Sequence, residues 1–121
     1  MAKGESLVAQ MTDLLDEVNK DVEKSARTNI QRVAKEAVQK LKNTSPSKTG
    51  DYAKGWGTKK QGEMDTVVYN RTMPGLTHLL ENGHVIRNKK GDYGRTSGKK
   101  HIKPVEEWAV DELPRRIMED I

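Results

Sequence analysis

The fold is decided first by residues 5–42, which read ESLVAQMTDLLDEVNKDVEKSARTNIQRVAKEAVQKLK. Apolar or small side chains recur there at every third or fourth position from Leu7 to Leu41, and charged side chains lie on the other faces. Neither glycine nor proline interrupts the stretch, and Asn43 and Pro46 follow it as stop signals. This spacing predicts one long amphipathic helix.

Such a helix is too long for the domain that carries it. Residues 5–42 would extend over about 57 Å as a helix, whereas a compact chain of 121 residues has a diameter of roughly 35 Å. Two alternatives follow. Either the helix breaks, with residues 25–29 as the expected place, or one end of it packs on a neighbouring subunit.

The middle of the chain is expected to be rich in short β elements. A turn-forming loop over 43–50 is followed by a bent or edge strand at 52–60, an antiparallel strand at 64–70, a short helix at 74–82 that Gly83 stops, and a short strand at 84–86. Residues 87–100 are polar and glycine-rich, which indicates a mobile loop.

The last part of the chain is predicted to be a helix that Pro104 opens. Pro114 lies within it and should kink or split it. The predicted fold class is therefore α+β, with a small, mostly antiparallel sheet of three to four strands. We expect one domain over 1–121, made of a helical arm (1–43), a β-rich body (44–103) with the basic loop 87–100, and a C-terminal helix (104–121).

The composition limits both the core and the chemistry. Apolar residues make up 33% of the chain and charged residues another 33%, so the core should be thin and completed in part by partner subunits. Cysteine is absent, which excludes disulfides and cysteine-based sites. No signal-like start and no apolar run of membrane-spanning length is visible, so we expect a soluble protein made in the cytosol.

Charge is distributed unevenly along the chain. The net charge is +2 over 1–50, +6 over 51–104 and −4 over 105–121. Most of the cations of the middle part lie in residues 87–103, the basic loop with Lys103, in which there are seven cations and a single acid, Asp92. The cations are Arg87, Lys89, Lys90, Arg95, Lys99, Lys100 and Lys103. This loop could be a solvated or partner-facing segment, or it could contact phosphate backbones without reading sequence.

The stretch His78, Glu81 and His84 has a spacing of three. With His101 it could in principle hold a metal ion, which keeps a small metalloenzyme as an alternative. However, the motif is not HExxH, and Gly83 should end the helix before His84. We therefore expect a helix end whose polar side chains bond neighbouring backbone, with no catalytic residue and no cofactor.

Four stretches carry a resemblance to the neck or head–tail joining (tail-completion) proteins of long non-contractile-tailed phages. Residues 45–50 (SPSKTG) look like the family's (T/S)P-x-x-TG element, and 67–70 (VVYN) look like its strand that ends in Asn. Residues 76–84 (LTHLLENGH) are close to its LTHLLE-x-GH signature, and 101–106 (HIKPVE) to its HI-x-P-x-E element. The matching positions are Pro46, Thr49, Gly50, Asn70, His78, Glu81, Gly83, His84, His101 and Pro104.

The resemblance implies a structural virion protein without catalysis or a small-molecule substrate. It implies a ring of six or twelve copies at the capsid–tail junction, between head-side connector and tail proteins, assembled in the host bacterial cytoplasm. A basic loop that points into the ring could also touch packaged DNA. The alternative from the residues alone is a sequence-nonspecific nucleic-acid-binding protein that uses residues 87–103.

Overall fold

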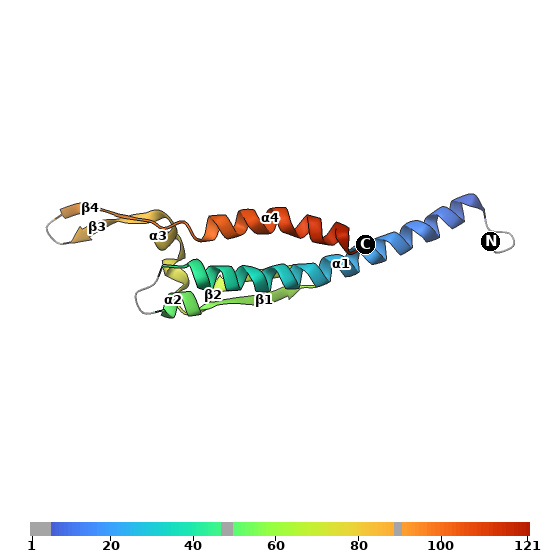
Figure 1. The fold of residues 1–121 in the computed structure, drawn as a ribbon. Coiled ribbons are helices and arrows are strands. Elements are labelled where there is room, and N and C mark those ends of the chain that lie inside the picture. The colour runs from blue at the N-terminus through green and yellow to red at the C-terminus, as the bar shows by residue number, and fades with distance from the viewer. Residues whose placement is uncertain (1–5, 47–49, 89–90) are drawn as a thin grey trace.

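The structure, a computed structural model, describes residues 6–46, 50–88 and 91–121, and it leaves out the side chains of 84–88 and 92–93. It confirms the α+β class, and Figure 1 shows an elongated molecule. The elements in chain order are α1 (Leu7–Thr44), α2 (Asp51–Lys54), β1 (Trp56–Gly62), β2 (Asp65–Asn70), the 3-10 helix η1 (Pro74–Leu76), α3 (Thr77–Asn82), β3 (Gly83–Asn88), β4 (Gly91–Ser97) and α4 (Ile102–Glu119).

Helix α1 is continuous over 38 residues, so the predicted break at 25–29 is wrong. The polar residues that suggested a break are buried and hold the end of α4 instead. The Ser25 hydroxyl donates to the Ile117 carbonyl at 2.9 Å, and Asn29 Nδ2 donates to the Asp120 carboxylate at 2.7 Å. Asn29 Nδ2 also donates to the Ser25 carbonyl within α1 at 2.9 Å, and the contacts to α4 hold both side chains without a break in the helix.

The predicted overshoot of this helix is real. The part of α1 that precedes Ser25 projects beyond the rest of the molecule (Figure 1), and its apolar side chains are exposed, with Leu7 and Val8 each at 72%. We call residues 7–24 the arm. Whether the arm packs on a neighbouring subunit stays a prediction.

The body forms around the C-terminal half of α1. Helix α4 lies along one side of it and the β1–β2 hairpin along another (Figure 1). The core is small, as the composition predicts. Its buried members are Ala37, Val38, Leu41, Tyr52, Trp56 and Val105.

The described strands form two separate antiparallel hairpins and do not join into one sheet. β1 pairs with β2 with Trp56 opposite Asn70, and a bulge follows Lys60. The strand expected at 52–60 is partly wrong, because residues 51–54 form the one-turn helix α2. That turn buries Tyr52 against the core, which outweighs the β propensity of an aromatic residue.

The loop expected over 87–100 is also a correction, since most of it is the β3–β4 hairpin. This hairpin extends away from the body at the end opposite the arm (Figure 1). Its residues show no regular alternation of apolar and polar side chains, so the usual sequence signal of a strand is missing. Gly91 and Gly94, at φ +120° and +106°, supply the backbone conformations that other residues rarely adopt.

Helix α4 begins at Ile102, two residues before Pro104, and runs through Pro114 without splitting. Pro104 lies in the first turn, where its missing N–H costs no helix bond. Pro114 deprives the Val110 carbonyl of its donor, but Val110 is 66% exposed and water can replace that bond. The split predicted at Pro114 is therefore wrong.

Candidate functional site

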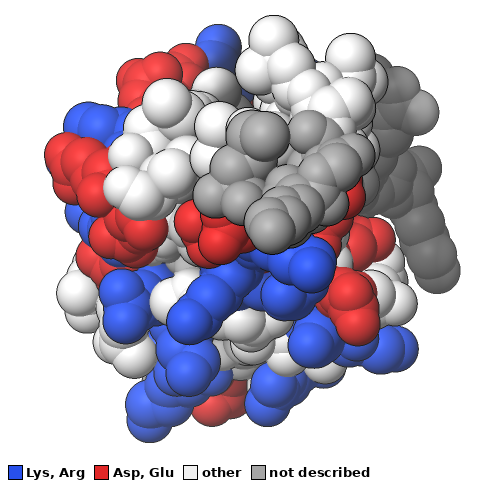
Figure 2. All heavy atoms as spheres, turned by 90° about the vertical axis from the view of Figure 1, so that its right-hand side faces the viewer, with Lys and Arg blue, Asp and Glu red and all other residues white. Residues whose placement is uncertain are grey.

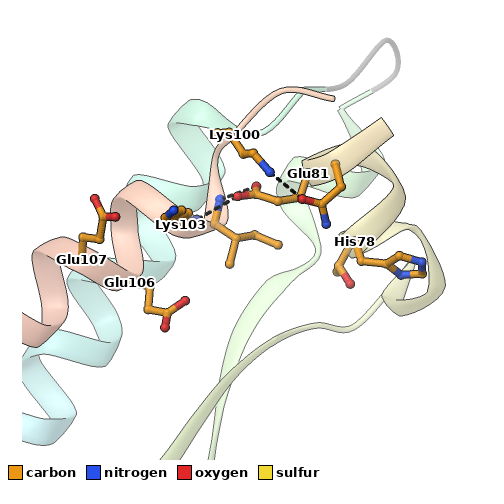
Figure 3. Close-up of a pocket in the computed structure, with 9 residues that line it drawn as sticks. His78, Glu81, Lys100, Lys103, Glu106 and Glu107 are labelled. Carbon is orange, nitrogen blue, oxygen red and sulfur yellow. Dashed lines mark hydrogen bonds between the residues drawn. The ribbon is translucent and has the colours of Figure 1, made fainter. Parts of the chain in front are cut away.

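The most concentrated polar site lies where α3 meets the start of α4, and its centre is Glu81 (Figure 3). Glu81 Oε1 accepts from the backbone N–H of His101 at 2.7 Å and of Ile102 at 2.8 Å. Its Oε2 accepts from the N–H of Lys103 at 3.0 Å. A side chain twenty positions upstream thus caps α4 and satisfies donors that a helix start leaves open.

These hydrogen bonds keep the Glu81 side chain ionised. Burial raises the pKa of its carboxyl, but the hydrogen bonds from Ile102, His101 and Lys103 outweigh burial and leave the pKa below its ordinary value. The positive end of the α4 dipole favours the same charged state. Glu81 is therefore an ionised structural cap with its oxygens already occupied.

His101 joins this cap to α2. Its ring is almost completely buried, and Nδ1 lies 2.7 Å from the Lys99 carbonyl and 3.0 Å from Glu81 Oε1. Both neighbours can only accept, so Nδ1 carries the proton. In the neutral ring Nε2 then accepts from the Tyr52 hydroxyl, 2.7 Å away. Burial, with the Glu81 carboxylate adding to it, raises the pKa of Tyr52 to about 12, so the phenol keeps its proton.

Asn70 ends β2 and ties it to α2. It is 2% exposed, its Nδ2 donates to the Tyr52 carbonyl at 2.7 Å, and its Oδ1 accepts from the Met73 N–H at 2.8 Å. The Asn70 side chain thus links α2 to the segment that follows β2. The nearby Trp56 ring is also buried, and its indole N–H donates to Ser45 Oγ at 2.7 Å.

Gly83 terminates α3 in a conformation that a side chain would not tolerate. Its φ is +79°, and a Cβ there would lie 2.2 Å from the Thr96 carbonyl oxygen. Gly50 precedes α2 with a φ of +84°, a backbone conformation that favours glycine, and its carbonyl accepts from the Lys54 N–H. Pro46 follows the end of α1. Thr49 lies outside the described residues.

The structure brings together only part of the predicted His78, Glu81, His84 and His101 group. Glu81 and His101 are in contact, whereas His78 is exposed and points away from Glu81 (Figure 3). The side chain of His84 is outside the described part. Among the residues that are described, no three histidine or carboxylate side chains converge on a point where a metal ion could sit.

A polar pocket of about 490 Å³ adjoins this site (Figure 3). Its rim carries both signs of charge, with Lys100 and Lys103 facing Glu106 and Glu107. The remaining lining residues are Thr77, His78, Glu81, Asn82 and Ile102. Glu81 is the buried carboxylate of this pocket, and backbone N–H groups already bond both of its oxygens. The other ionisable residues that line the pocket are exposed side chains.

The predicted basic residues lie on and beside the β3–β4 hairpin. Arg95, Lys99 and Lys100 are exposed, and two of them are held by Asn82: Arg95 donates to its carbonyl and Lys100 to its side-chain oxygen. Arg87 lies on β3, with its side chain outside the description, and Lys89 and Lys90 are not described at all. Arg87 and Arg95 therefore lie on the strands of a hairpin and not in the mobile loop predicted, whereas Lys99 and Lys100 follow that hairpin.

The acidic C-terminal segment is less free than its net charge suggests. Glu112 pairs with Arg115 and Arg116, and Arg116 also pairs with Glu36 on α1. These hydrogen bonds and charges from Arg116 and Arg115 lower the pKa of Glu112. Glu112 and Glu119 are thus paired within α4, and Arg116 links α4 to Glu36 of α1.

A basic groove of about 340 Å³ between α1 and β1 was not predicted from the sequence. Lys35, Lys42 and Arg71 line it, and no acid lies among its lining residues. Val38 and Trp56 contribute apolar surface to the same groove. Lys35 and Lys42 lie two helical turns apart on α1, and the packing of the hairpin on α1 adds Arg71, which is distant in the sequence.

None of the described helices is both long and apolar enough to cross a membrane. The searches of curated proteins and of solved structures each found no match. A family model does match residues 9–83, which is more than half of the chain, and its description is "Bacteriophage HK97-gp10, putative tail-component". The matched span runs from the arm through the hairpin β1–β2 to the Gly83 stop, and on this match the chain belongs to the HK97-gp10-like family of phage tail components.

Proposed function

We propose that this protein is a structural subunit of the neck of a tailed phage or prophage virion. Copies of it would form a ring of six or twelve at the capsid–tail junction, between the head-side connector and the tail, and complete that junction without catalysing a reaction. Membership of a phage tail-component family supports a virion role.

The observation that carries the proposal is the arm. Eighteen residues of α1 precede the first buried position, Ser25, and expose apolar side chains along their length. Monomeric proteins rarely leave so large a continuous apolar surface in water, and such surfaces usually mark interaction sites. A subunit that is completed by its neighbours explains both this surface and the small core.

A structural role also fits the chemistry of the signature residues. The polar side-chain atoms of Glu81 and His101 are hydrogen-bonded to the backbone at the start of α4, to the Lys99 carbonyl and to the Tyr52 hydroxyl. A general base or metal ligand needs a lone pair that can reach a substrate or an ion. The signature is therefore best explained as the device that joins α2, α3 and α4.

Deletion of the gene in a phage that carries it tests the proposal. We expect DNA-filled heads and free tails that remain unjoined, seen by electron microscopy, and recovery of joined particles when the wild-type gene is supplied in trans. Infectious particles that form without the protein would refute the proposed role.

A second candidate function is contact with nucleic acid, favoured by the projection of the β3–β4 hairpin and its exposed cations (Figure 1). Binding through Arg95, Lys99 and Lys100 should fall steeply as salt rises from about 0.05 to 1 M. The test is duplex binding by wild type and by the triple variant R95Q/K99Q/K100Q, with K59Q/K60Q on the other hairpin as the control. Equal binding by wild type and the triple variant would exclude this surface.

A further inference from the structure

The arm carries its apolar side chains on one face. At 3.6 residues per turn these positions fall within an arc of about 120°. We call them the apolar stripe. They are Leu7, Val8, Met11, Leu14, Leu15, Val18 and Val22. All but Val22 are exposed, from 44% at Val18 to 72% at Leu7 and Val8.

The apolar stripe continues the face of α1 that is buried in the body. Farther along the helix, Val33 and Ala37 lie on this face and are covered. The cover ends with α4, whose last residues contact Ser25 and Asn29. Since α1 is one continuous helix that points away from the body (Figure 1), the arm cannot fold back onto its own body.

The charged side chains beside the apolar stripe indicate what kind of surface can bind the arm. Acidic residues lie beside it, with Glu17 and Asp21 on one side, where Lys24 is also near, and with Glu23 on the other. Two arms packed face to face would bring these carboxylates together, which is unfavourable. The complementary partner is an apolar surface with a basic rim.

The basic groove described above supplies the basic rim, whereas its two apolar lining residues, Val38 and Trp56, are largely buried in the core and leave only a small apolar surface. Neither Lys35 nor Lys42 takes part in a hydrogen bond or ion pair within the described ranges, and both are exposed. Arg71 connects the groove to the outer face of the hairpin, because its guanidinium lies 5.8 Å from the Tyr69 ring, and Val67 lies on the same face of β2 as Tyr69. Figure 2 looks along the molecule from the arm end, and in it Lys and Arg gather on the lower side, where Figure 1 draws the hairpin.

We propose that the arm of one copy lies along the basic groove of the next copy, with the apolar stripe against Val67 and Tyr69 of the hairpin and with the acidic residues of the arm beside Lys35, Lys42 and Arg71. The inference deepens the proposed ring and rests on it. Because arm and groove are different surfaces, the contact is head-to-tail, which is the kind that generates rings.

Crosslinking between single-cysteine variants tests this pairing, and the chain has no cysteine of its own to interfere. L14C is mixed with Q39C, whose side chain lines the groove, and a short bismaleimide reagent is added. We expect an L14C–Q39C heterodimer at least tenfold more abundant than one formed by L14C with V110C, an exposed position on α4. A dominant L14C–L14C product would overturn the proposal in favour of arm–arm pairing.

Charge reversal gives an independent readout. K35E/K42E in the groove should reduce the heterodimer at least tenfold, and E17K/D21K in the arm of the other copy should restore it. A crosslink that ignores both reversals overturns the proposed groove, as does the absence of any heterodimer at about 1 mM protein. Phage deletion separates the two ideas: if unjoined heads and tails accumulate while no arm–groove crosslink forms, the neck role survives and this contact does not.

Discussion

Replacing Glu81 by Gln tests whether the signature helix works by capping α4. The substitution keeps the size of the side chain but removes its charge. The remaining carbonyl oxygen can still accept from His101 and Ile102, as Oε1 does now. The new NH₂ group faces the Lys103 N–H, which approaches Oε2 at 3.0 Å, so two donors oppose each other.

The expected cost follows from these contacts. Losing one hydrogen bond to a charged acceptor removes about 1.5–3 kcal/mol, and losing a negative charge at a helix start removes roughly 0.3–1 kcal/mol more. The free energy of unfolding should therefore fall by about 2–4 kcal/mol in E81Q. For a chain of this length that corresponds to a decrease in Tm on the order of 10 °C.

Urea unfolding at pH 7, followed by circular dichroism, measures this difference. The matched control is E107Q, the same substitution at an exposed position of α4 for which no partner is seen within the described residues. We expect the control to stay within about 0.5 kcal/mol of wild type. If E81Q were as stable as E107Q, the capping argument would be wrong.

Three further predictions concern the pH dependence of the Glu81 cap, the Asn70 hydrogen bonds and the arm. The difference in free energy of unfolding between wild type and E81Q should be full above about pH 5 and shrink as pH falls through the lowered pKa of Glu81. The reason is that protonation then removes the charge from the wild-type side chain too. A difference that stays constant in urea titrations down to about pH 3 would contradict this. N70A should lower the free energy of unfolding by about 1–3 kcal/mol, since it leaves the Tyr52 carbonyl and the Met73 N–H without their partner, whereas exposed Q61A should be neutral in the same urea assay. L14S/V18S should change the Tm of the isolated protein by no more than about 2 °C, because the arm lies outside the core, and yet abolish joined particles when it replaces wild type in the phage; a large loss of Tm would place the arm within the folded unit.

Much of the fold could be predicted from local sequence. The spacing of apolar residues from Leu7 to Leu41 predicts α1, and Gly83 predicts the stop of α3. These signals act within a few residues, so the sequence shows them directly. The breaks suggested at residues 25–29 and at Pro114 were wrong, because contacts from Ile117 and Asp120 and access of water to Val110 compensate for the local defects.

The sequence by itself determined the α+β class, the long amphipathic helix that overshoots its body, and the family signature. Only the tertiary structure decided that Glu81 caps a helix twenty positions away, that Tyr52 meets His101, and that Lys35, Lys42 and Arg71 form one groove. The physical reason is range. Helix periodicity and glycine stops arise from neighbours along the chain, whereas the partner of a buried charge is chosen by which segments pack together and exclude water.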